Sequence, residues 1–174
     1  MQLYKKLLLI TFLFLFNQNN LFADVPAYLD FKYILNESSA GKKAQLELKK
    51  ELEDGFKNLT NKEKSIQEEE KKIIQQKKII SAEEYKKKVQ TLRSKVSTLQ
   101  KDRDTLLKKV GKKRAKGKEE LLKNLNPIIS EYMVEKKIRM VLDKKSLLLA
   151  DEKLDITQDI LKILNKKLKT LKLN

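Results

Sequence analysis

The sequence predicts a mainly α-helical protein with a small β-body, in which a long antiparallel coiled-coil hairpin projects from a short-stranded oligomerisation body. Residues 38–132 carry apolar side chains every three or four positions, and short alternating apolar segments lie on both sides of this stretch. Of the 174 residues, 37% are charged, and there are only four glycines and two prolines. This composition is typical of long helices and not of a β-sandwich or barrel.

Residues 1–23 have the pattern of a secretory signal peptide. Lys5 and Lys6 form a positive end, residues 7–16 are almost entirely apolar, and Ala23 is a small residue suited to cleavage. As a helix the apolar run would reach about 15 Å, whereas a bilayer needs about 20 residues. We therefore expect export and removal of this segment, and the alternative is an uncleaved anchor.

The first part of the body is predicted over residues 24–37. Residues 27–31 alternate loosely and predict a short strand, and residues 32–36 predict a helical turn. The long helix is expected to begin around residues 38–41.

The predicted arm covers residues 38–132. Its first leg repeats an apolar residue every seven positions, at Leu52, Leu59, Ile66, Ile73 and Ile80. Its second leg alternates steps of three and four, at Tyr85, Val89, Leu92, Val96, Leu99, Leu106 and Val110. This spacing keeps a narrow stripe on one helix face, as in a coiled coil. Ser81 and Glu84 form a capping box, which marks a helix start and therefore a chain reversal.

One antiparallel register brings the apolar residues of the two legs together: Ile73 with Val89, Ile66 with Val96, and Leu52 with Val110. The same register places Leu59 opposite Arg103, and Glu70 opposite Leu92. The seam is therefore thin, and we expect a flexible, partly hydrated arm of about 60 Å.

Residues 108–118 read KKVGKKRAKGK and contain seven basic residues but no acidic one. Gly111 and Gly117 each weaken a helix by about 1 kcal/mol relative to Ala, so we expect the arm to flex here. The glycine spacing does not match a phosphate-binding loop, and Glu119 stands where such a loop has Ser or Thr. Pro127 is expected to kink the second leg.

The second part of the body, residues 133–174, is predicted to contain two strands and a C-terminal helix. Residues 137–143 and 147–150 predict the strands, and Thr157 is a plausible N-cap for the helix. Asp159 in the first turn suits the helix dipole.

Such a small body buries few apolar residues per chain, which favours oligomerisation. The residues assigned to the oligomerisation core are Leu29, Phe31, Met140, Leu142, Leu148, Ile156 and Ile160. The alternative is a monomeric core made of the same residues. Asp30, Asp143 and Asp155 are interpreted as turn and capping residues.

The residue types present argue against catalysis. The chain has no cysteine and no histidine, so it lacks a thiolate, the usual general base and the usual zinc ligand. We expect no enzyme activity, no metal site and no cofactor. Without the signal, 38 basic residues stand against 24 acidic ones, a net charge of +14. This charge favours acidic partners, which include nucleic acid, anionic lipid and acidic polypeptides, and the signal peptide makes nucleic acid the least expected of these.

Two groups of basic and apolar residues are candidates for binding such a partner. The first surrounds the hairpin turn and comprises Lys77, Lys78, Ile79, Ile80, Lys86, Lys87 and Lys88. The second lies in the basic run and comprises Lys112, Lys113, Arg114, Lys116 and Lys118. The alternative for both groups is a charged surface that only keeps the arm soluble.

Short motifs at both ends of the mature chain carry a family resemblance. The first comprises Tyr28-Leu29-Asp30, Leu35, Ser38, Gly41 and Lys42, and the second comprises residues 138–143, 148–151, 154–157 and 164–165. They resemble the start and the end of the Skp/OmpH family of periplasmic outer-membrane-protein chaperones. The helical middle fits by length and pattern, and the high lysine content and basic tail depart from the family.

The resemblance implies a jellyfish-like homotrimer in the periplasm, with three helical arms around a cavity. It implies an ATP-independent holdase that keeps unfolded outer-membrane β-barrel proteins from aggregating. An anionic membrane or lipopolysaccharide surface is a further partner to consider, although no residue for it can be assigned. The alternatives are a basic coiled-coil scaffold of the cell envelope and a nucleic-acid-binding protein.

Overall fold

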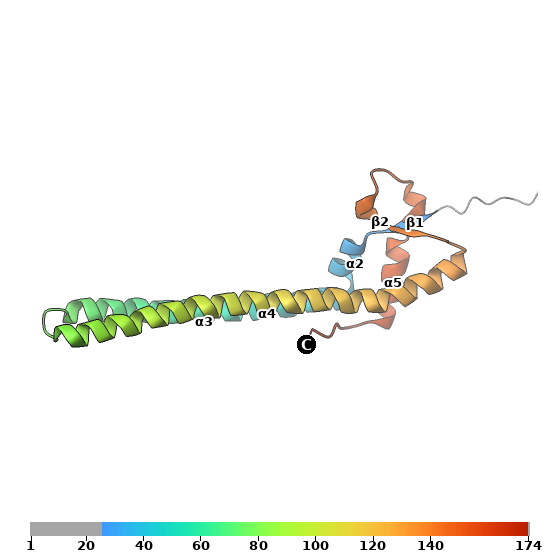
Figure 1. Cartoon of the computed structure of the whole chain (residues 1–174). Coiled ribbons are helices and arrows are strands. Elements are labelled where there is room, and N and C mark those ends of the chain that lie inside the picture. Colours follow the sequence, from blue (N-terminus) through green and yellow to red (C-terminus); the bar gives the residue numbers. More distant parts are fainter. Residues whose placement is uncertain (1–25, 174) are drawn as a thin grey trace, which may run out of the picture.

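The structure is a computed structural model that describes residues 26–173, so the predicted signal peptide lies outside the described residues. A hairpin of two long helices, α3 (Ser39–Gln76) and α4 (Ala82–Lys136), extends from a small body, and the C-terminal end lies beside the base of the hairpin (Figure 1). This architecture confirms the predicted fold class of a helical arm on a small β-containing body.

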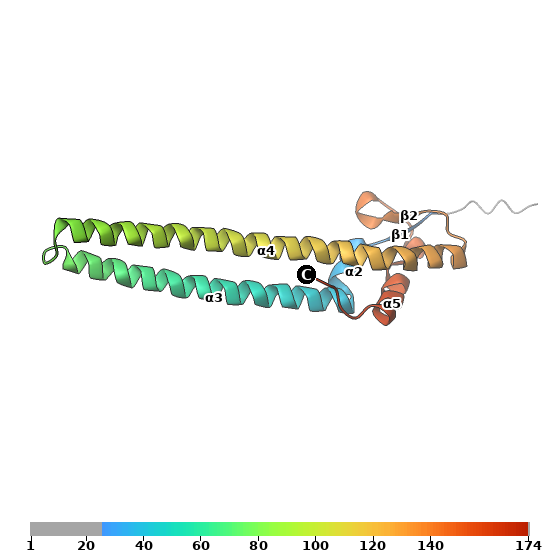
Figure 2. The same cartoon turned by 60° about the horizontal axis from the view of Figure 1, so that its bottom comes forward.

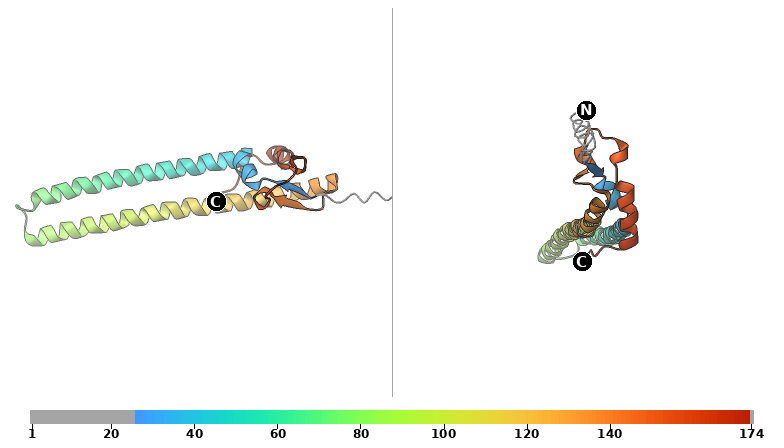
Figure 3. Two further views of the ribbon diagram at one scale, coloured as in Figure 1. Left: turned by 90° about the horizontal axis from the view of Figure 1, so that it is seen from above. Right: turned by 90° about the vertical axis from the view of Figure 1, so that its right-hand side faces the viewer.

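The two arm helices run antiparallel and stay side by side along the whole arm (Figures 2 and 3). Ion pairs join them at three levels. Lys113 Nζ lies 2.8 Å from Glu51 near the body, Lys62 Nζ lies 2.6 Å from Asp102 in the middle, and Lys95 Nζ lies 2.5 Å from Glu69 further out. These pairs flank the predicted apolar positions, so the helices pair in close to the expected register.

The predicted juxtaposition of Leu59 and Arg103 is wrong. Leu59 is buried beside Asp102 and Leu106, while Arg103 is exposed. Gly55, which was not part of the predicted seam, has no side chain, and Leu106 packs against its backbone. Leu106 therefore reaches across the seam and replaces the expected charged layer with an apolar one.

The turn between the helices forms as the capping box predicts. The Ser81 hydroxyl accepts a hydrogen bond from the backbone N–H of Glu84 at 3.2 Å, and α4 begins at the next residue after Ser81. Helix α4 then continues through Gly111, Gly117 and Pro127 without a break.

The body contains a two-stranded parallel sheet of β1 (Ala27–Leu29) and β2 (Val141–Asp143). Tyr28 pairs with Leu142 on one side and forms a bridge to Asp155 on the other. Helix α2 (Phe31–Glu37) leads into α3, and α5 (Thr157–Lys167) packs across the body end of α4.

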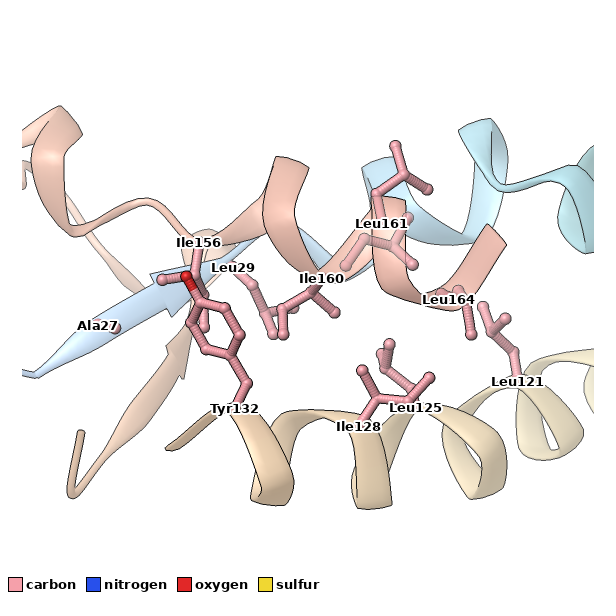
Figure 4. Packing of buried hydrophobic residues seen from close by; sticks show 11 residues of the cluster. Ala27, Leu29, Leu121, Leu125, Ile128, Tyr132, Ile156, Ile160, Leu161 and Leu164 are labelled. Atoms are coloured by element: carbon pink, nitrogen blue, oxygen red, sulfur yellow. The ribbon is translucent and has the colours of Figure 1, made fainter. Parts of the chain in front are cut away.

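The body core lies between α4, α5 and β1 (Figure 4). Its fully buried side chains include Ile34, Leu121, Leu125, Ile160 and Leu164. Two of these five come from the last part of α4, so the long helix of the arm also supplies one wall of the body.

The predicted strands differ from the observed ones. Strand β1 stops at Leu29 because Asp30 caps α2, its side chain accepting the N–H of Tyr33 at 2.8 Å. Strand β2 starts only at Val141 because α4 extends to Lys136 and Lys137 adopts a left-handed conformation that ends the helix.

Residues 147–150 do not form the predicted strand. They lie between two short 3₁₀ turns, η1 (Lys144–Ser146) and η2 (Glu152–Leu154), and Leu148 is fully exposed. A strand needs a hydrogen-bonding partner, and the place beside β1 is taken by Asp155, with the N–H of Ile156 bonded to the Tyr28 carbonyl at 2.9 Å.

Thr157 is not the N-cap that the sequence predicted. It is the first residue of α5, and its hydroxyl accepts the backbone N–H of Asp30 at 2.8 Å. Asp155 takes the local role, since its carboxylate accepts the N–H of Thr157 at 2.9 Å. Burial opposes the charge on Asp155, but hydrogen bonds from Thr157 and the ion pair with Lys144 outweigh it and hold the pKa of this carboxyl below its usual value.

Candidate functional site

The arm tip gathers the first group of candidate residues. Residues 77–81 connect α3 to α4, and Ile79 is 80% exposed at this turn. Lys77 lies 5.8 Å from the centre of the Tyr85 ring, a cation–π contact that holds the ammonium near the turn. Lys88 is less available because it donates to Gln76 at 2.7 Å and pairs with Glu84 at 3.6 Å. The tip therefore presents an exposed apolar residue among cations.

Next to the tip, the seam between α3 and α4 opens into a cleft of about 480 Å³. Apolar side chains supply most of its lining, from Ile66, Ile73, Ile74, Tyr85, Val89, Leu92 and Val96, together with Glu70 and Arg93. Val96 is 51% exposed, so this part of the seam is open to solvent. The pairing of Glu70 with Leu92 is the sequence signal for this opening, because a carboxylate does not fill the space that an apolar partner would.

The second group of candidate residues does not form one surface. Helix α4 is continuous here, so Lys112, Lys113, Arg114, Lys116 and Lys118 point in different directions around it. Lys113 is half-buried against Glu51, and the Lys118 ammonium lies 5.9 Å from the centre of the Phe31 ring. Lys112 and Arg114 are exposed.

Glu51 joins two lysines of α4 to α3. Its carboxylate lies 2.8 Å from Lys109 Nζ and 2.8 Å from Lys113 Nζ, and these hydrogen bonds lower the pKa of Glu51. Part of the basic run therefore holds the arm together. Lys112 follows Lys88 by 24 residues of the same helix, which corresponds to about 36 Å along its axis. The remaining cations are therefore separate from the tip lysines.

Four large apolar side chains of the body are exposed to solvent in the single chain. Val134 is 82% exposed, Met140 54%, Leu148 104% and Leu149 92%. Large apolar residues at such exposure favour a covered interface. Met140 and Leu148 were assigned to the oligomerisation core from sequence, whereas Val134 and Leu149 were missed because nothing in their spacing separates them from core positions.

The other residues assigned to the oligomerisation core lie inside the chain. Leu29, Ile156 and Ile160 are buried in the body core (Figure 4). Phe31 is partly buried and packs against this core. Leu142 is half-buried on β2. The predicted set therefore divides into an internal core and an exposed remainder.

Among residues 26–173, no group of three or more His, Cys, Asp or Glu side chains is placed to hold a metal ion. Within the same range, no helix combines the length and apolar character needed to cross a membrane.

Comparisons with known proteins agree on one relationship. The family described as outer membrane protein (OmpH-like) matches residues 26–164. A solved structure from Caulobacter crescentus, described as a candidate outer membrane chaperone (OmpH-like), is similar in fold, with a TM-score of 0.78. The two sequences are 23% identical, and the similarity covers 85% of this chain and 89% of the other. No curated protein matches the sequence.

Proposed function

Because the chain belongs to the outer membrane protein (OmpH-like) family, we propose that it is a chaperone that holds unfolded outer-membrane β-barrel proteins in the periplasm without ATP. The observation that carries this proposal is the arm, which is long and highly charged but keeps apolar side chains accessible. Ile74, Ile79 and Val96 are each at least half exposed near the tip. An unfolded polypeptide can contact many such sites weakly and leave them again.

The assembly proposed for this function is a homotrimer with three arms around a cavity. The exposed Val134, Met140, Leu148 and Leu149 supply the apolar surface that such an assembly would cover. The sheet has only two strands of three residues each, so a body of this size gains much of its stability from burying that surface.

The cations at the tip support a role in contacting clients. Lys78, Lys86 and Lys87 are exposed around Ile79, and a client with acidic and apolar residues would complement both features. An anionic membrane or lipopolysaccharide surface would complement the same cations. Binding to anionic vesicles compared with neutral ones separates this second partner from the protein client.

The test is the mass of the mature protein by light scattering, alone and with a urea-unfolded outer-membrane barrel protein. We expect a trimer that keeps the client soluble at a fixed ratio. A monomer or dimer that lets the client aggregate contradicts the proposal and favours an envelope scaffold. Equally tight binding to folded acidic proteins also contradicts it, because charge alone would then explain binding.

A variant identifies the contribution of the tip. Ile79→Ser removes an apolar side chain that packs against little in the arm, so we expect unchanged stability and weaker client holding by about 3-fold. Leu46→Ser is the matched control, since Leu46 is 66% exposed at the body end of α3.

A further inference from the structure

The segment that follows α5, residues 168–173, returns along the base of the arm and lies beside α3 and α4 (Figures 1 and 2). We call it the tail segment. Leu173 is only 5% exposed and forms a second apolar cluster with Ala44, Leu48 and Val110. Leu171 packs against both this cluster and the body core. The tail segment thus occupies a groove between the two arm helices.

The groove is shaped to admit a side chain at this point. Gly117 lies in its wall, and a Cβ added there would come within 2.8 Å of Leu173 Cδ2. On the opposite helix, Ala44 of the same cluster also has only a small side chain. Toward the tip, Leu52 and Leu106 pack against the same cluster, so the apolar floor continues beyond the residue that now fills it.

The end of the tail segment, residues 171–173, alternates apolar and polar side chains as a β-strand does. Leu171 and Leu173 are two residues apart, so in an extended chain they face the same side, and the exposed Lys172 between them faces away. Strands of outer-membrane barrels alternate apolar and polar residues with this same period of two. The family match ends at residue 164, so the tail segment lies beyond the matched region.

We propose that the groove is a binding site for extended polypeptide segments with alternating apolar residues, and that the tail segment occupies it in place of a client. This inference rests on the proposed chaperone function. The tail is tethered, so its effective concentration at the groove is on the order of millimolar, and only a client that makes several contacts displaces it. The tail thereby keeps the apolar groove covered when no client is present.

The experiment compares two full-length variants with the native chain. Leu173→Ser weakens the buried anchor, and Lys172→Ser is the matched control in the same segment. We expect Leu173→Ser to bind a urea-unfolded barrel protein about 3- to 10-fold more tightly, and Lys172→Ser to bind it as the native chain does. Circular dichroism melting verifies that both variants keep the helical arm.

A second measurement does not depend on chaperone activity. A fluorescein-labelled peptide with the sequence KLKTLKLN, residues 167–174, is titrated into the full-length double variant Leu171→Ser/Leu173→Ser and into the native chain. We expect the double variant, whose groove is vacated, to bind the peptide at least 10-fold more tightly, and the unfolded client to displace it.

The outcomes separate the two proposals. If no form of the chain holds the client, the proposed function fails. If the native chain holds the client but Leu173→Ser holds it no more tightly, the tail is only a structural brace and this inference fails. Equal peptide binding to the native chain and the double variant also overturns it.

Discussion

Gly55 of α3 lies directly beneath the Leu106 side chain of α4. A Cβ added at residue 55 would come within 2.5 Å of Leu106 Cδ2 and 2.6 Å of Cδ1. The absence of a side chain on one helix is therefore what allows an apolar side chain of the other helix to close the middle of the seam. This contact lies between the polar pair Lys62–Asp102 and the pairs made by Glu51.

Replacing Gly55 with Ala should destabilise the arm although Ala favours a helix. The propensity gain is about 1 kcal/mol, but overpacking against Leu106 costs about 1–3 kcal/mol. Gly111→Ala is the control, because nothing lies within 4 Å of an added Cβ there, and it should stabilise by about 1 kcal/mol. Urea unfolding measures both, and a stabilising Gly55→Ala would contradict the packing described.

Glu51→Gln should lower the melting temperature at neutral pH. The carboxylate bridges Lys109 and Lys113, and its pKa is lowered in the folded chain. A lowered pKa means that the stabilisation is present above the unfolded pKa and is lost as the pH falls through the folded value. The difference between variant and native chain should therefore shrink in acid and in high salt. Glu53→Gln, which removes only a 3.7 Å pair with Lys49, should change little.

Tyr132 should ionise at a higher pH than a free tyrosine side chain. Burial and the hydrogen bond that its hydroxyl donates to Asp159 at 2.6 Å raise its pKa to about 12. The stabilisation is thus complete below about pH 10 and is lost as the pH rises toward 12. An ultraviolet absorbance titration should show one late step that Tyr132→Phe removes. The same variant should cost about 1.5 kcal/mol at neutral pH, because a bond to a charged acceptor is lost.

Thr157→Val should weaken the connection between the two ends of the body. The Thr157 hydroxyl accepts the N–H of Asp30, and these residues are 127 positions apart. Valine keeps the shape but leaves that N–H without its partner, at a cost of about 1–2 kcal/mol. Thr157→Ser retains the hydroxyl and should therefore lose less stability than Thr157→Val. Equal stability of the valine variant and the native chain in urea would show that the bond contributes nothing.

Local signals were sufficient to predict the arm. The seven-residue spacing of Leu52, Leu59, Ile66 and Ile73 and the Ser81 cap depend only on helix geometry and on backbone groups within one turn. The antiparallel register followed from matching one apolar stripe to the other. The motifs at both ends of the chain similarly predicted the family, which the match over residues 26–164 confirms.

The body was less predictable because its contacts join distant segments. Residues 147–150 have strand-like composition, but the edge of β1 is occupied by Asp155 and no partner remains for them there. Thr157 has the residue type of a helix cap, but its hydroxyl can accept a hydrogen bond from any nearby N–H. Folding places the backbone N–H of Asp30 next to this hydroxyl. The candidate residues of the basic run likewise proved not to form one surface only once α4 was seen to be continuous through them.

Periodicity, capping and composition were enough to establish a long helical hairpin on a small body, since each acts within a few residues of the chain. The tertiary structure decided which apolar side chains became core, which stayed exposed, and where Leu106 and Leu173 found room beside Gly55 and Gly117. The physical reason is that burial and hydrogen bonding depend on the partner across the fold, and a linear pattern does not specify that partner.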